Sequence, residues 1–443
     1  MKGVQEIKNW LAQEYIKSRL QVKRIPFNDS QEWHWDEEGF LSHLTKRFFR
    51  VMGIISFLIP EGLVLSRPII DQSEIGLLSF LVFKEHEEWW ILVQAKAEPG
   101  NIGGVQLAPT VQATKSNYEI VHGGSCTPYL SIAQVHRGAL YERLQSEQNS
   151  CFFAKRNLNK VVLISEKIDE RDSRFKWMRI RELLPLLGQS HIVNTDARSV
   201  IACWLFSDLH SLRQCLLAHN PFTEMVIKSS DSENSLNYDD AIEQWLIALN
   251  AKWMMDRKVV SLKNFDYPWV CGESEILCRD DPSLKVYQIS VSCAKREVAL
   301  WDQPIIGSEN PSCIMLFLGA FRGTLHFLIQ AKLEIGNRSG FELTSTVQAA
   351  ASTMDDNEKK YVKMADDGGK LLLSFQNSEE GGRFDRCVSE YKIVWMEDAL
   401  KEQEGPFHRW ISLPQLSNFL HMENRITNEL RSAISSLLSI NEI

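Results

Sequence analysis

The amino-acid sequence predicts an α+β protein in which one domain occurs twice. Helical and strand-like periodicities both occur along the chain. A polar stretch, Trp89–Tyr118, returns 236 positions later at Leu325–Met354 without a gap. The segments that flank this stretch also return in the same order, so the repeat is a duplicated domain and not a short-period solenoid.

Length and composition narrow the class of protein. A chain of 443 residues is too long for one hydrophobic core, and its net charge of −8 argues against a broad nucleic-acid footprint or a polybasic membrane surface. The opening residues hold no apolar signal-peptide core, and the longest apolar runs are too short to span a bilayer. The nine cysteines follow no repeating pattern, which predicts reduced structural thiols in a cytoplasmic protein.

The first half begins with a predicted helix. Ile7, Trp10, Leu11, Tyr15 and Leu20 recur at helical spacing and predict a packing helix over residues 5–24. Apolar and β-branched runs predict three strands: Ile75–Lys84, Glu88–Lys96 and Asn159–Ser165. Two more helices are predicted: Lys176–Leu187 with Gly188 as its C-cap, and a helix that is N-capped at Asn194 and runs through Leu212.

A polar, serine-rich segment divides the chain. Residues 228–239 read KSSDSENSLNYD and predict a linker between an N-terminal domain, residues 1–227, and a C-terminal domain, residues 240–443. After the linker the order of elements starts again, with an amphipathic helix at Ala241–Trp253. The motif Arg67-Pro-Ile-Ile has its counterpart in Gln303-Pro-Ile-Ile.

The repeated stretch places charged and amide side chains on a strand that otherwise looks like sheet core. Alternation puts Leu92, Gln94, Lys96 and Glu98 on one face of this strand. We expect it to pair with a returning strand at Thr110–Thr114, which would gather these polar groups on one surface. A solvated face of an edge strand is the alternative, although the aromatic and aliphatic start of the strand favours burial, where Lys96 and Glu98 need partners.

Polar side chains that follow the strand add candidates for a ligand site. The glycine-rich turn from Gly100 to Gly104 would let backbone amides approach a ligand, although turn formation alone also explains it. Tyr118 and His122 are candidate acid or base groups, with packing as the alternative. Arg156 and Asn157 offer donors for a diphosphate, with a solvated basic turn as the alternative.

Several catalytic signatures are absent from the sequence. There is no G-x-S-x-G elbow, H-E-x-x-H motif, Walker loop or G-x-G-x-x-G fingerprint. The carboxylate-rich Nudix helix is also missing, and Ser378-Glu-Glu-Gly-Gly is the nearest fragment of it. Metal-dependent hydrolysis is therefore disfavoured, and we expect neither a metal nor a cofactor.

The motif QAKAEPGN…GVQLAPTVQATKSNY, with the segments Ser146–Gln148, Lys155–Asn157 and Val193–Val200, resembles the NDP-hexose 2,3-dehydratases of deoxysugar biosynthesis. This resemblance implies two tandem Nudix-like domains, each an α/β sandwich, in a homodimer. It also implies a dTDP-linked 4-keto-6-deoxyhexose as substrate, no nucleic-acid or membrane partner, and two related pockets of which one is a remnant.

The resemblance also implies roles for individual residues. Glu98 is the first candidate for the general base and His122 the second, while Tyr118 or His122 would protonate the leaving hydroxyl. Lys96, Gln94 or Asn117 would stabilise the enolate oxygen. The substrate-binding candidates are Gln94, Asn101, Gln106, Thr110, Gln112, Asn117, Arg156, Asn157 and Arg198. Arg156 is the first candidate to hold the diphosphate and Arg198 the second, with a helix-surface position as the alternative for Arg198.

The two copies of the motif differ in ways that favour the first as the working site. The first keeps Pro99, Pro109 and the Asn117-Tyr118 pair, and the second lacks all of them. The residues of the predicted vestigial pocket are Gln330, Lys332, Glu334, Asn337 and Gln348. A Nudix-like sugar-nucleotide hydrolase and a noncatalytic sugar-nucleotide binding protein are the alternative functions.

Overall fold

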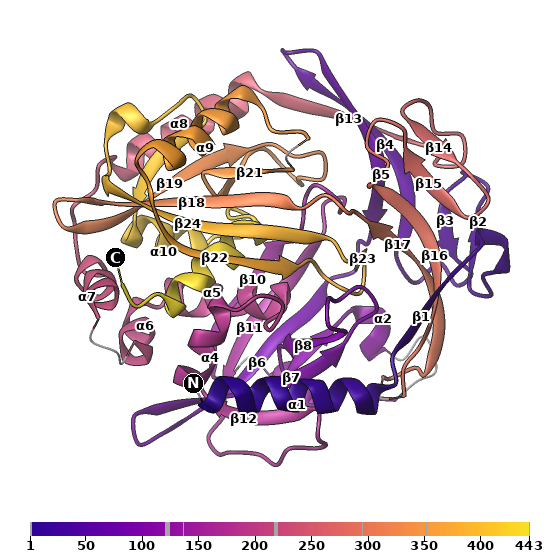
Figure 1. The fold of residues 1–443 in the computed structure, drawn as a ribbon, viewed down its shortest axis with the longest axis horizontal. Helices are drawn as coiled ribbons and strands as arrows, with labels where there is room; N and C mark the ends of the chain where they lie inside the picture. The colour runs from indigo at the N-terminus through magenta and orange to yellow at the C-terminus, as the bar shows by residue number, and fades with distance from the viewer. Residues whose placement is uncertain are drawn as a thin grey trace.

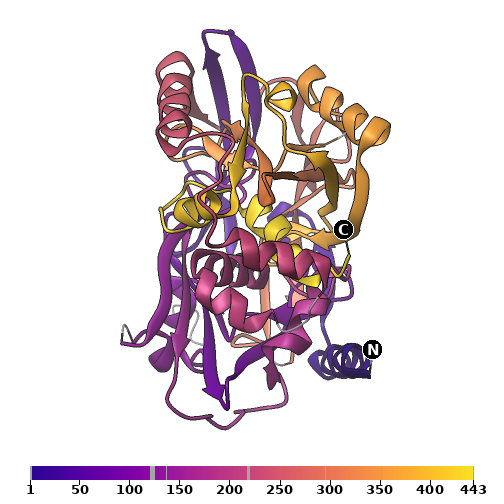
Figure 2. The same ribbon diagram turned by 90° about the vertical axis from the view of Figure 1, so that its left-hand side faces the viewer.

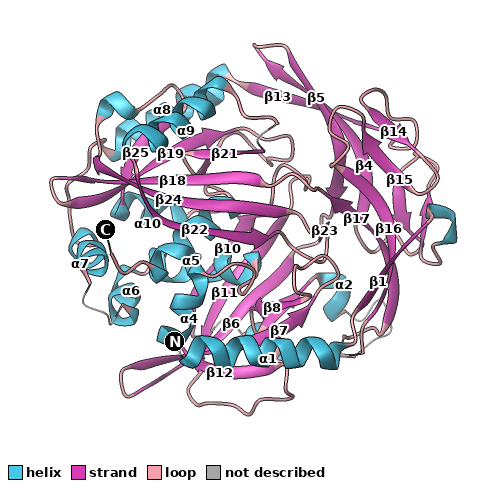
Figure 3. Ribbon diagram, in the orientation of Figure 1, coloured by secondary structure: helices cyan, strands magenta, loops and turns pink. Residues whose placement is uncertain are grey.

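The chain folds into four β-sheets with helices between and around them (Figure 1). These sheets belong to a computed structural model that describes residues 2–119, 125–135, 137–216, 220–294, 296–350 and 352–442. Strands and helices are mixed throughout both halves, as Figure 3 shows. The predicted combination of α and β structure in a duplicated chain is therefore confirmed.

The first half builds one seven-stranded sheet in the order β10-β11-β6-β7-β12, with β8 on β7 and β9 on β6. Its strands are β6 (Gly76–Glu85), β7 (Glu88–Ala97), β8 (Val105–Ala108), β9 (Val111–Ala113), β10 (Ala139–Ser146), β11 (Arg156–Leu163) and β12 (Phe175–Arg179). The sheet is mixed, because β11 runs parallel to β6 whereas β7 runs antiparallel to it.

The second half repeats this sheet strand for strand. Its order is β22-β24-β18-β19-β25, with β20 on β19 and β21 on β18, and β24 is again the parallel neighbour. Its strands are β18 (Ser312–Phe321), β19 (Thr324–Lys332), β20 (Glu342–Thr344), β21 (Val347–Ala350), β22 (Lys370–Ser378), β24 (Val388–Asp398) and β25 (His408–Ser412). The repeated motif therefore occupies the same position, β7–β9 or β19–β21, in each large sheet.

The two smaller sheets show that the halves exchange strands. The sheet of β2 (Trp33–Trp35), β3 (Leu41–His43), β4 (Arg50–Ile59) and β5 (Leu63–Asp71) receives β13 (Met254–Val260) from the second half. The sheet of β14 (Trp269–Cys271), β15 (Glu275–Cys278), β16 (Lys285–Ser292), β17 (Leu300–Gly307) and β23 (Phe384–Asp385) receives β1 (Gln21–Ile25) from the first. Figure 1 shows both exchanged strands in place. Each half therefore completes a sheet of the other.

Two buried helices hold the large sheets together. The helices α5 (Thr195–Ser207) and α11 (Asn428–Ser436) pack on each other, and every residue in both is buried. Figure 2 shows helices of the two halves side by side at the centre of the molecule. One hydrophobic cluster, which includes Phe80, Trp204, Phe327 and Leu430, runs through both halves. The molecule therefore has a shared core between its two large sheets.

The other helices cover the sheets and connect them. They are α1 (Lys2–Ser18), α2 (Lys115–Tyr118), α3 (Leu130–Ala133), α4 (Ile180–Leu183), α6 (Leu209–Cys215), α7 (Pro221–Ser229), α8 (Asp239–Lys252), α9 (Asp356–Gly368) and α10 (Leu413–Leu420), with short 3₁₀ turns at Phe27–Asp29, Leu184–Gly188, Lys401–Gln403 and Leu437–Ser439. Nowhere in the described ranges is a helix long and apolar enough to cross a membrane. The nine cysteines are all free.

Three helix predictions are corrected by tertiary pairing. The first helix ends at Ser18, and residues 21–25 instead form β1, because β16 of the second half supplies its hydrogen-bonding partner. Residues 176–179 belong to β12, which pairs with β7, so helix starts only at Ile180. The helix that Asn194 caps stops at Ser207, because the Asp208 side chain caps a new helix, α6, that starts at Leu209.

The domain boundaries at residues 227 and 240 remain a prediction. Residues 230–238 do connect α7 to α8. Because β1 and β13 each complete a sheet of the opposite half, a chain cut at this point would remove one strand from each small sheet.

The contact between the halves at Gly100 leads to a first prediction. A Cβ atom on Gly100 would lie 1.7 Å from the carbonyl oxygen of Phe384, so an alanine there must push the halves apart. Gly100→Ala is expected to lower the free energy of unfolding by about 3 kcal/mol, measured by urea denaturation. Gly368→Ala is the control, because no atom lies within 4 Å of its added Cβ. Wild-type stability of Gly100→Ala would show that this contact does not hold the halves together.

Candidate functional site

The polar end of β7 forms a buried network of hydrogen bonds. Lys96 is 8% exposed and Glu98 3%, which rules out the solvated edge strand. The Lys96 Nζ atom lies 3.4 Å from Glu98 Oε1 and donates to the carbonyl oxygen of Gln112 at 2.9 Å. Gln112 Nε2 donates to Glu98 Oε1 at 3.1 Å, and Asn101 Nδ2 lies 3.4 Å from the other carboxylate oxygen. We call Gln94, Lys96, Glu98, Asn101, Gln106 and Gln112 the first cluster.

The returning segment reaches this cluster by a different pairing from the one predicted. It splits into β8, which pairs with β7, and β9, which pairs with β6, so Thr110–Thr114 does not pair with the Lys96 strand. Thr110 explains the split. Its hydroxyl donates to the carbonyl of Leu92 on β7 and accepts from the Leu81 amide of β6 at 3.1 Å, bridging the two strands where they separate. Thr110 therefore lies inside the sheet.

The first turn of α5 adds two side chains that the sequence did not indicate as site residues. Asn194 caps the helix by accepting from the Ala197 amide, and its Nδ2 donates to Gln112 Oε1 at 2.9 Å. Asp196 is buried beside the cluster, and its Oδ1 atom has no hydrogen-bond partner. Burial raises the pKa of Asp196, and nearby carboxylates raise it further. The N-cap pattern identified the helix start but gave no signal that these side chains face the motif.

The opposite half closes the first cluster. Its segment Ser378–Arg386 lies against the glycine turn, with the Gly100 amide donating to the Gly381 carbonyl at 2.8 Å. Gln106 Nε2 donates to Ser378 Oγ at 2.9 Å. Glu380 in the same segment is desolvated, which raises its pKa; Arg383 lowers that pKa and Glu98 raises it. Sequence reasoning missed these residues because almost three hundred positions separate them from the motif.

The second copy of the motif forms an equivalent cluster against the first half. Gln348 Nε2 donates to Glu334 Oε1 at 3.2 Å, and Ser146 Oγ donates to Glu342 Oε2 at 2.5 Å. Lys332 differs from its counterpart Lys96, because Glu358 of α9 binds its Nζ at 3.0 Å. The predicted vestigial residues Gln330, Lys332, Glu334, Asn337 and Gln348 thus do gather as a second cluster, which is completed by a carboxylate from α9.

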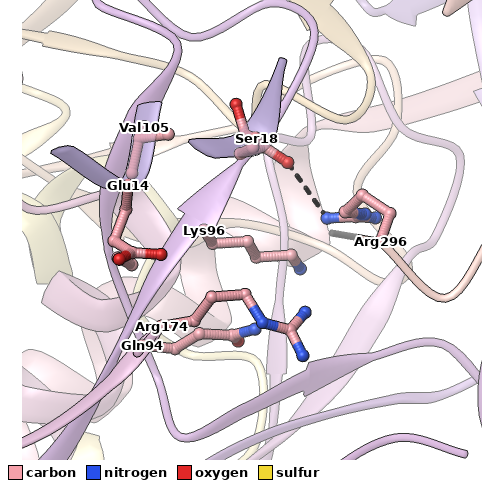
Figure 4. A pocket seen from close by; sticks show the side chains of 9 residues that line it. Glu14, Ser18, Gln94, Lys96, Val105, Arg174 and Arg296 are labelled. Atoms are coloured by element: carbon pink, nitrogen blue, oxygen red, sulfur yellow. Dashed lines mark hydrogen bonds between the residues drawn. The ribbon is translucent and has the colours of Figure 1, made fainter. Parts of the chain in front are cut away.

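A small pocket opens beside the first cluster at the edge of β7 (Figure 4). Gln94 and Lys96 line it together with Arg174 and Arg296, and Glu14 and Ser18 of α1 lie across from them. Figure 4 shows the charged ends of Lys96 and Arg174 directed towards the same space. Burial lowers the pKa of Lys96, and Glu98 opposes that shift. Three cationic side chains therefore gather at a pocket of about 10 Å³, which has room for about one water molecule, and one of them, Arg174, is already bound to Asp172 at 2.8 Å.

Other candidate residues lie outside this pocket. Arg198 is fully buried in α5, where its guanidinium donates to the carbonyl oxygens of Val193 and Leu187, so the helix-surface alternative is wrong. Asn157 joins strands, accepting from the Gly76 amide and donating to Glu147. Arg156 lies 4.0 Å from Glu423. The structure therefore does not bring Arg156, Asn157 or Arg198 to the cationic pocket.

Of the candidates Asn117, Tyr118 and His122, the structure describes the first in full, the second in part and the third not at all. Asn117 lies in the short helix α2, where its amide bonds to the carbonyl of Thr114. Tyr118 ends this helix, but its side chain lies outside what the structure describes, and His122 lies outside the described residues. In the ranges that are described, no group of three or more His, Cys, Asp or Glu side chains is arranged to hold a metal ion.

The fold and the site define the chain as an internally duplicated α+β protein with two buried polar clusters, each completed by the opposite half. The profile of the NDP-hexose 2,3-dehydratase family matches residues 4–204 and again residues 239–437. The chain belongs to this family, which confirms the resemblance and the duplication.

Three relatives are similar along almost the whole chain, and each is named dTDP-4-dehydro-6-deoxy-alpha-D-glucopyranose 2,3-dehydratase. The protein from Saccharopolyspora spinosa is 32% identical over 97% of this chain and 90% of its own length. Those from Amycolatopsis orientalis and Streptomyces violaceoruber are 27% and 28% identical, over 98% and 97% of this chain and 90% and 96% of their own lengths. A solved ADP compounds hydrolase matches 30% of this chain and 71% of its own at 11% identity, but its TM-score of 0.19 is too low to support an inference.

The second cluster leads to a prediction about stability and pH. Burial raises the pKa of Glu342 to about 7, above the ordinary value of 4.5. The protonated carboxyl therefore stabilises the fold fully below pH 4.5, and this contribution is lost as the pH rises through 7. Glu342→Gln should remove up to about 1.4 kcal/mol per pH unit of this dependence, measured by urea unfolding from pH 5 to 8.

The first cluster supports this substitution, because Gln106 occupies the equivalent position there and also bonds a serine hydroxyl. The exposed Glu61→Gln is the control and should keep the wild-type slope. Parallel stability curves for wild type and Glu342→Gln would contradict the assignment to Glu342.

Proposed function

We propose that the protein is a sugar-nucleotide 2,3-dehydratase, a hydro-lyase of deoxysugar biosynthesis. It removes the C2 hydroxyl of dTDP-4-keto-6-deoxy-D-glucose to give dTDP-3,4-diketo-2,6-dideoxy-D-glucose. The observation that carries the proposal is the similarity, over 97% of the chain, to a relative named for this activity. The buried Lys96–Glu98 network and the cationic pocket beside it supply groups that this chemistry needs.

The substrate itself makes the reaction accessible to side chains. Its C4 ketone acidifies the C3 proton, which a general base removes to form an enolate. A general acid then assists the departure of the C2 hydroxyl, and the resulting 2,3-enol tautomerises to the diketone. The protein must supply a base, an acid and donors for the developing oxyanion.

The first cluster offers groups for these roles. Glu98 is the base, because Gln112 and Asn101 hold its carboxylate in one orientation without neutralising it. Lys96 stabilises the enolate oxygen from its position 3.4 Å from Glu98. Arg174 and Arg296 are proposed for the diphosphate in place of Arg156 and Arg198, because they line the pocket with Lys96 and their planar guanidinium groups match phosphate oxygens. Arg174 would then exchange its 2.8 Å contact with Asp172 for a phosphate oxygen.

The first cluster, and not the second, is proposed as the working site. Glu358 of α9 pairs with Lys332 in the second cluster, so that lysine is already neutralised by a carboxylate of its own half. Lys96 instead faces the pocket with two arginines beside it. Both lysines are paired with a carboxylate, Lys96 with Glu98 at 3.4 Å and Lys332 with Glu358 at 3.0 Å, so the choice of the first cluster rests on the two arginines that line its pocket.

Three finer features of the proposal rest on the family resemblance. Each half is taken to be a Nudix-like domain, and the repeated mixed sheet with its buried helix supports that reading. The protein is proposed to act as a homodimer and to be cytoplasmic, which its nine unpaired thiols support.

The test is turnover of the proposed substrate in D₂O. The full chain should convert dTDP-4-keto-6-deoxy-D-glucose with loss of water and uptake of deuterium at C2, detected by mass spectrometry and NMR. Glu98→Gln should lower kcat by about 10²- to 10⁴-fold, the range typical of a lost general base. Divalent-metal dependence with release of a nucleotide would instead support the hydrolase alternative.

The duplication provides a matched control for Glu98. Glu334 is the same residue of the second cluster, and Glu334→Gln should leave kcat within a few-fold of wild type. The reverse result, with Glu334→Gln inactive and Glu98→Gln active, would move the chemistry to the second cluster. Binding of the sugar nucleotide without any deuterium uptake would support a noncatalytic binding protein.

A further inference from the structure

The two halves dock on each other at both clusters through the same backbone contacts. At the first cluster the Gly100 amide donates to Gly381, and the Arg386 amide donates back to Gly100 at 2.9 Å. At the second cluster the Gly336 amide donates to Asn149, and Ala154 donates back to Gly336, both at 2.8 Å. Neither glycine has room for a Cβ atom. Each cluster is thus built against a fixed segment of the other half.

This docking brings Glu380 of the second half next to Glu98 of the first. The point where a Cβ atom would lie on Gly382 is 3.4 Å from Glu380 Oε1 and 3.7 Å from Glu98 Oε1. No other atom outside the neighbouring residues lies within 4 Å of that point. Two carboxyl groups from opposite halves therefore face one small open space.

Two polar atoms of the first cluster and its neighbouring helix are available to a ligand. Asn101 Oδ1 and Asp196 Oδ1 are both buried and have no hydrogen-bond partner. The Asn101 oxygen lies next to Gly381, since a Cβ atom there would be 2.2 Å away from it. Leaving a buried acceptor unpaired costs about 1–3 kcal/mol, so a hydroxyl of a bound ligand would be stabilised there. The second cluster has such atoms too, at Glu334 Oε2 and Glu429 Oε2.

We propose that Glu380, supplied by the second half, is a catalytic carboxyl of the first cluster and acts as the general acid opposite Glu98. The inference rests on the dehydratase function proposed above and adds to it a residue from outside the motif. It makes the working site composite, so that neither half holds the complete acid–base pair.

The environment of Glu380 suits it to be a proton donor. Desolvation raises the pKa of Glu380, Arg383 lowers it, and the charge of Glu98 raises it again. A raised pKa favours the protonated form of Glu380, which is the form that a general acid needs.

The elimination begins with removal of a proton from C3. The Glu98 carboxylate takes the C3 proton, and the C3–H electron pair forms the C3=C4 bond of the enolate. The C4 carbonyl then reforms, a C2=C3 bond forms, and the C2–O bond breaks as Glu380 gives its proton to the departing hydroxyl, which leaves as water. The enol loses its O3 proton to solvent and C2 gains one from solvent. Water finally removes the proton from Glu98 and returns one to Glu380.

The second cluster shows that an amide is accepted at the position of Glu380. The segment Ser146-Glu-Gln of the first half corresponds to Ser378-Glu-Glu of the second, which places Gln148 where Glu380 stands. The serines match as well, because Ser146 bonds Glu342 and Ser378 bonds Gln106. The second cluster therefore receives an amide that cannot donate a proton as an acid, and the fold tolerates it.

The test is Glu380→Gln in the full chain with dTDP-4-keto-6-deoxy-D-glucose in D₂O. We expect kcat to fall at least about 100-fold with KM within about 3-fold of wild type. Deuterium should still enter C3 of the recovered substrate, because Glu98 can form the enolate without the acid. Glu98→Gln should lose both turnover and C3 exchange, and Glu380→Asp should recover part of the kcat lost in Glu380→Gln.

The neighbouring Glu379→Gln is the control for loss of a carboxylate from this segment. Glu379 accepts from Ser389 at 2.6 Å and Gln148 at 2.7 Å, and its variant should keep kcat within a few-fold once the folded fraction is measured by circular dichroism. Near wild-type kcat in Glu380→Gln, or loss of C3 exchange as complete as in Glu98→Gln, would overturn the role of Glu380. A wild-type chain without turnover or C3 exchange would overturn the proposed function itself.

Discussion

The reciprocal docking of the two glycine turns is the contact on which the rest of the structure depends. Gly100 and Gly336 lie so close to the backbone of the opposite half that only a hydrogen atom fits between them. Both turns immediately follow the strands that carry the charged residues of the motif. The same contact that joins the halves therefore closes each polar cluster, and stability and site geometry are linked through it.

Charged side chains are buried where the two halves meet, and burial changes how they are paired and how they titrate. The arginines of the equivalent helices α5 and α11, Arg198 and Arg431, are both fully buried, and both donate to backbone carbonyls. Such arginines support the shared core between the sheets. The carboxyls beside the first cluster are also buried. Burial removes water from Asp196 and Glu380 and so raises the pKa of both.

The duplicated chain has preserved its scaffold more strictly than its charges. The serine that bonds the opposite half recurs at both clusters, while its partner is Gln106 in one and Glu342 in the other. Gln148 stands in the first half at the position equivalent to Glu380, and Lys332 has Glu358 as a partner that Lys96 lacks. Hydrogen-bond geometry is thus common to the two clusters, whereas protonation chemistry differs between them.

Local pattern in the sequence determined the repeated motif, the alternation that sets Lys96 and Glu98 apart from the core, and the N-cap at Asn194. The alternation and the N-cap depend on residues a few positions apart, and the repeated motif is found by comparing the two halves of the sequence. Only the tertiary structure decided that residues 21–25 and 176–179 are strands, that Arg198 is buried, and that Glu380 faces Glu98. Each of these depends on a partner brought near by folding, often from the other half, and no local periodicity records such a partner.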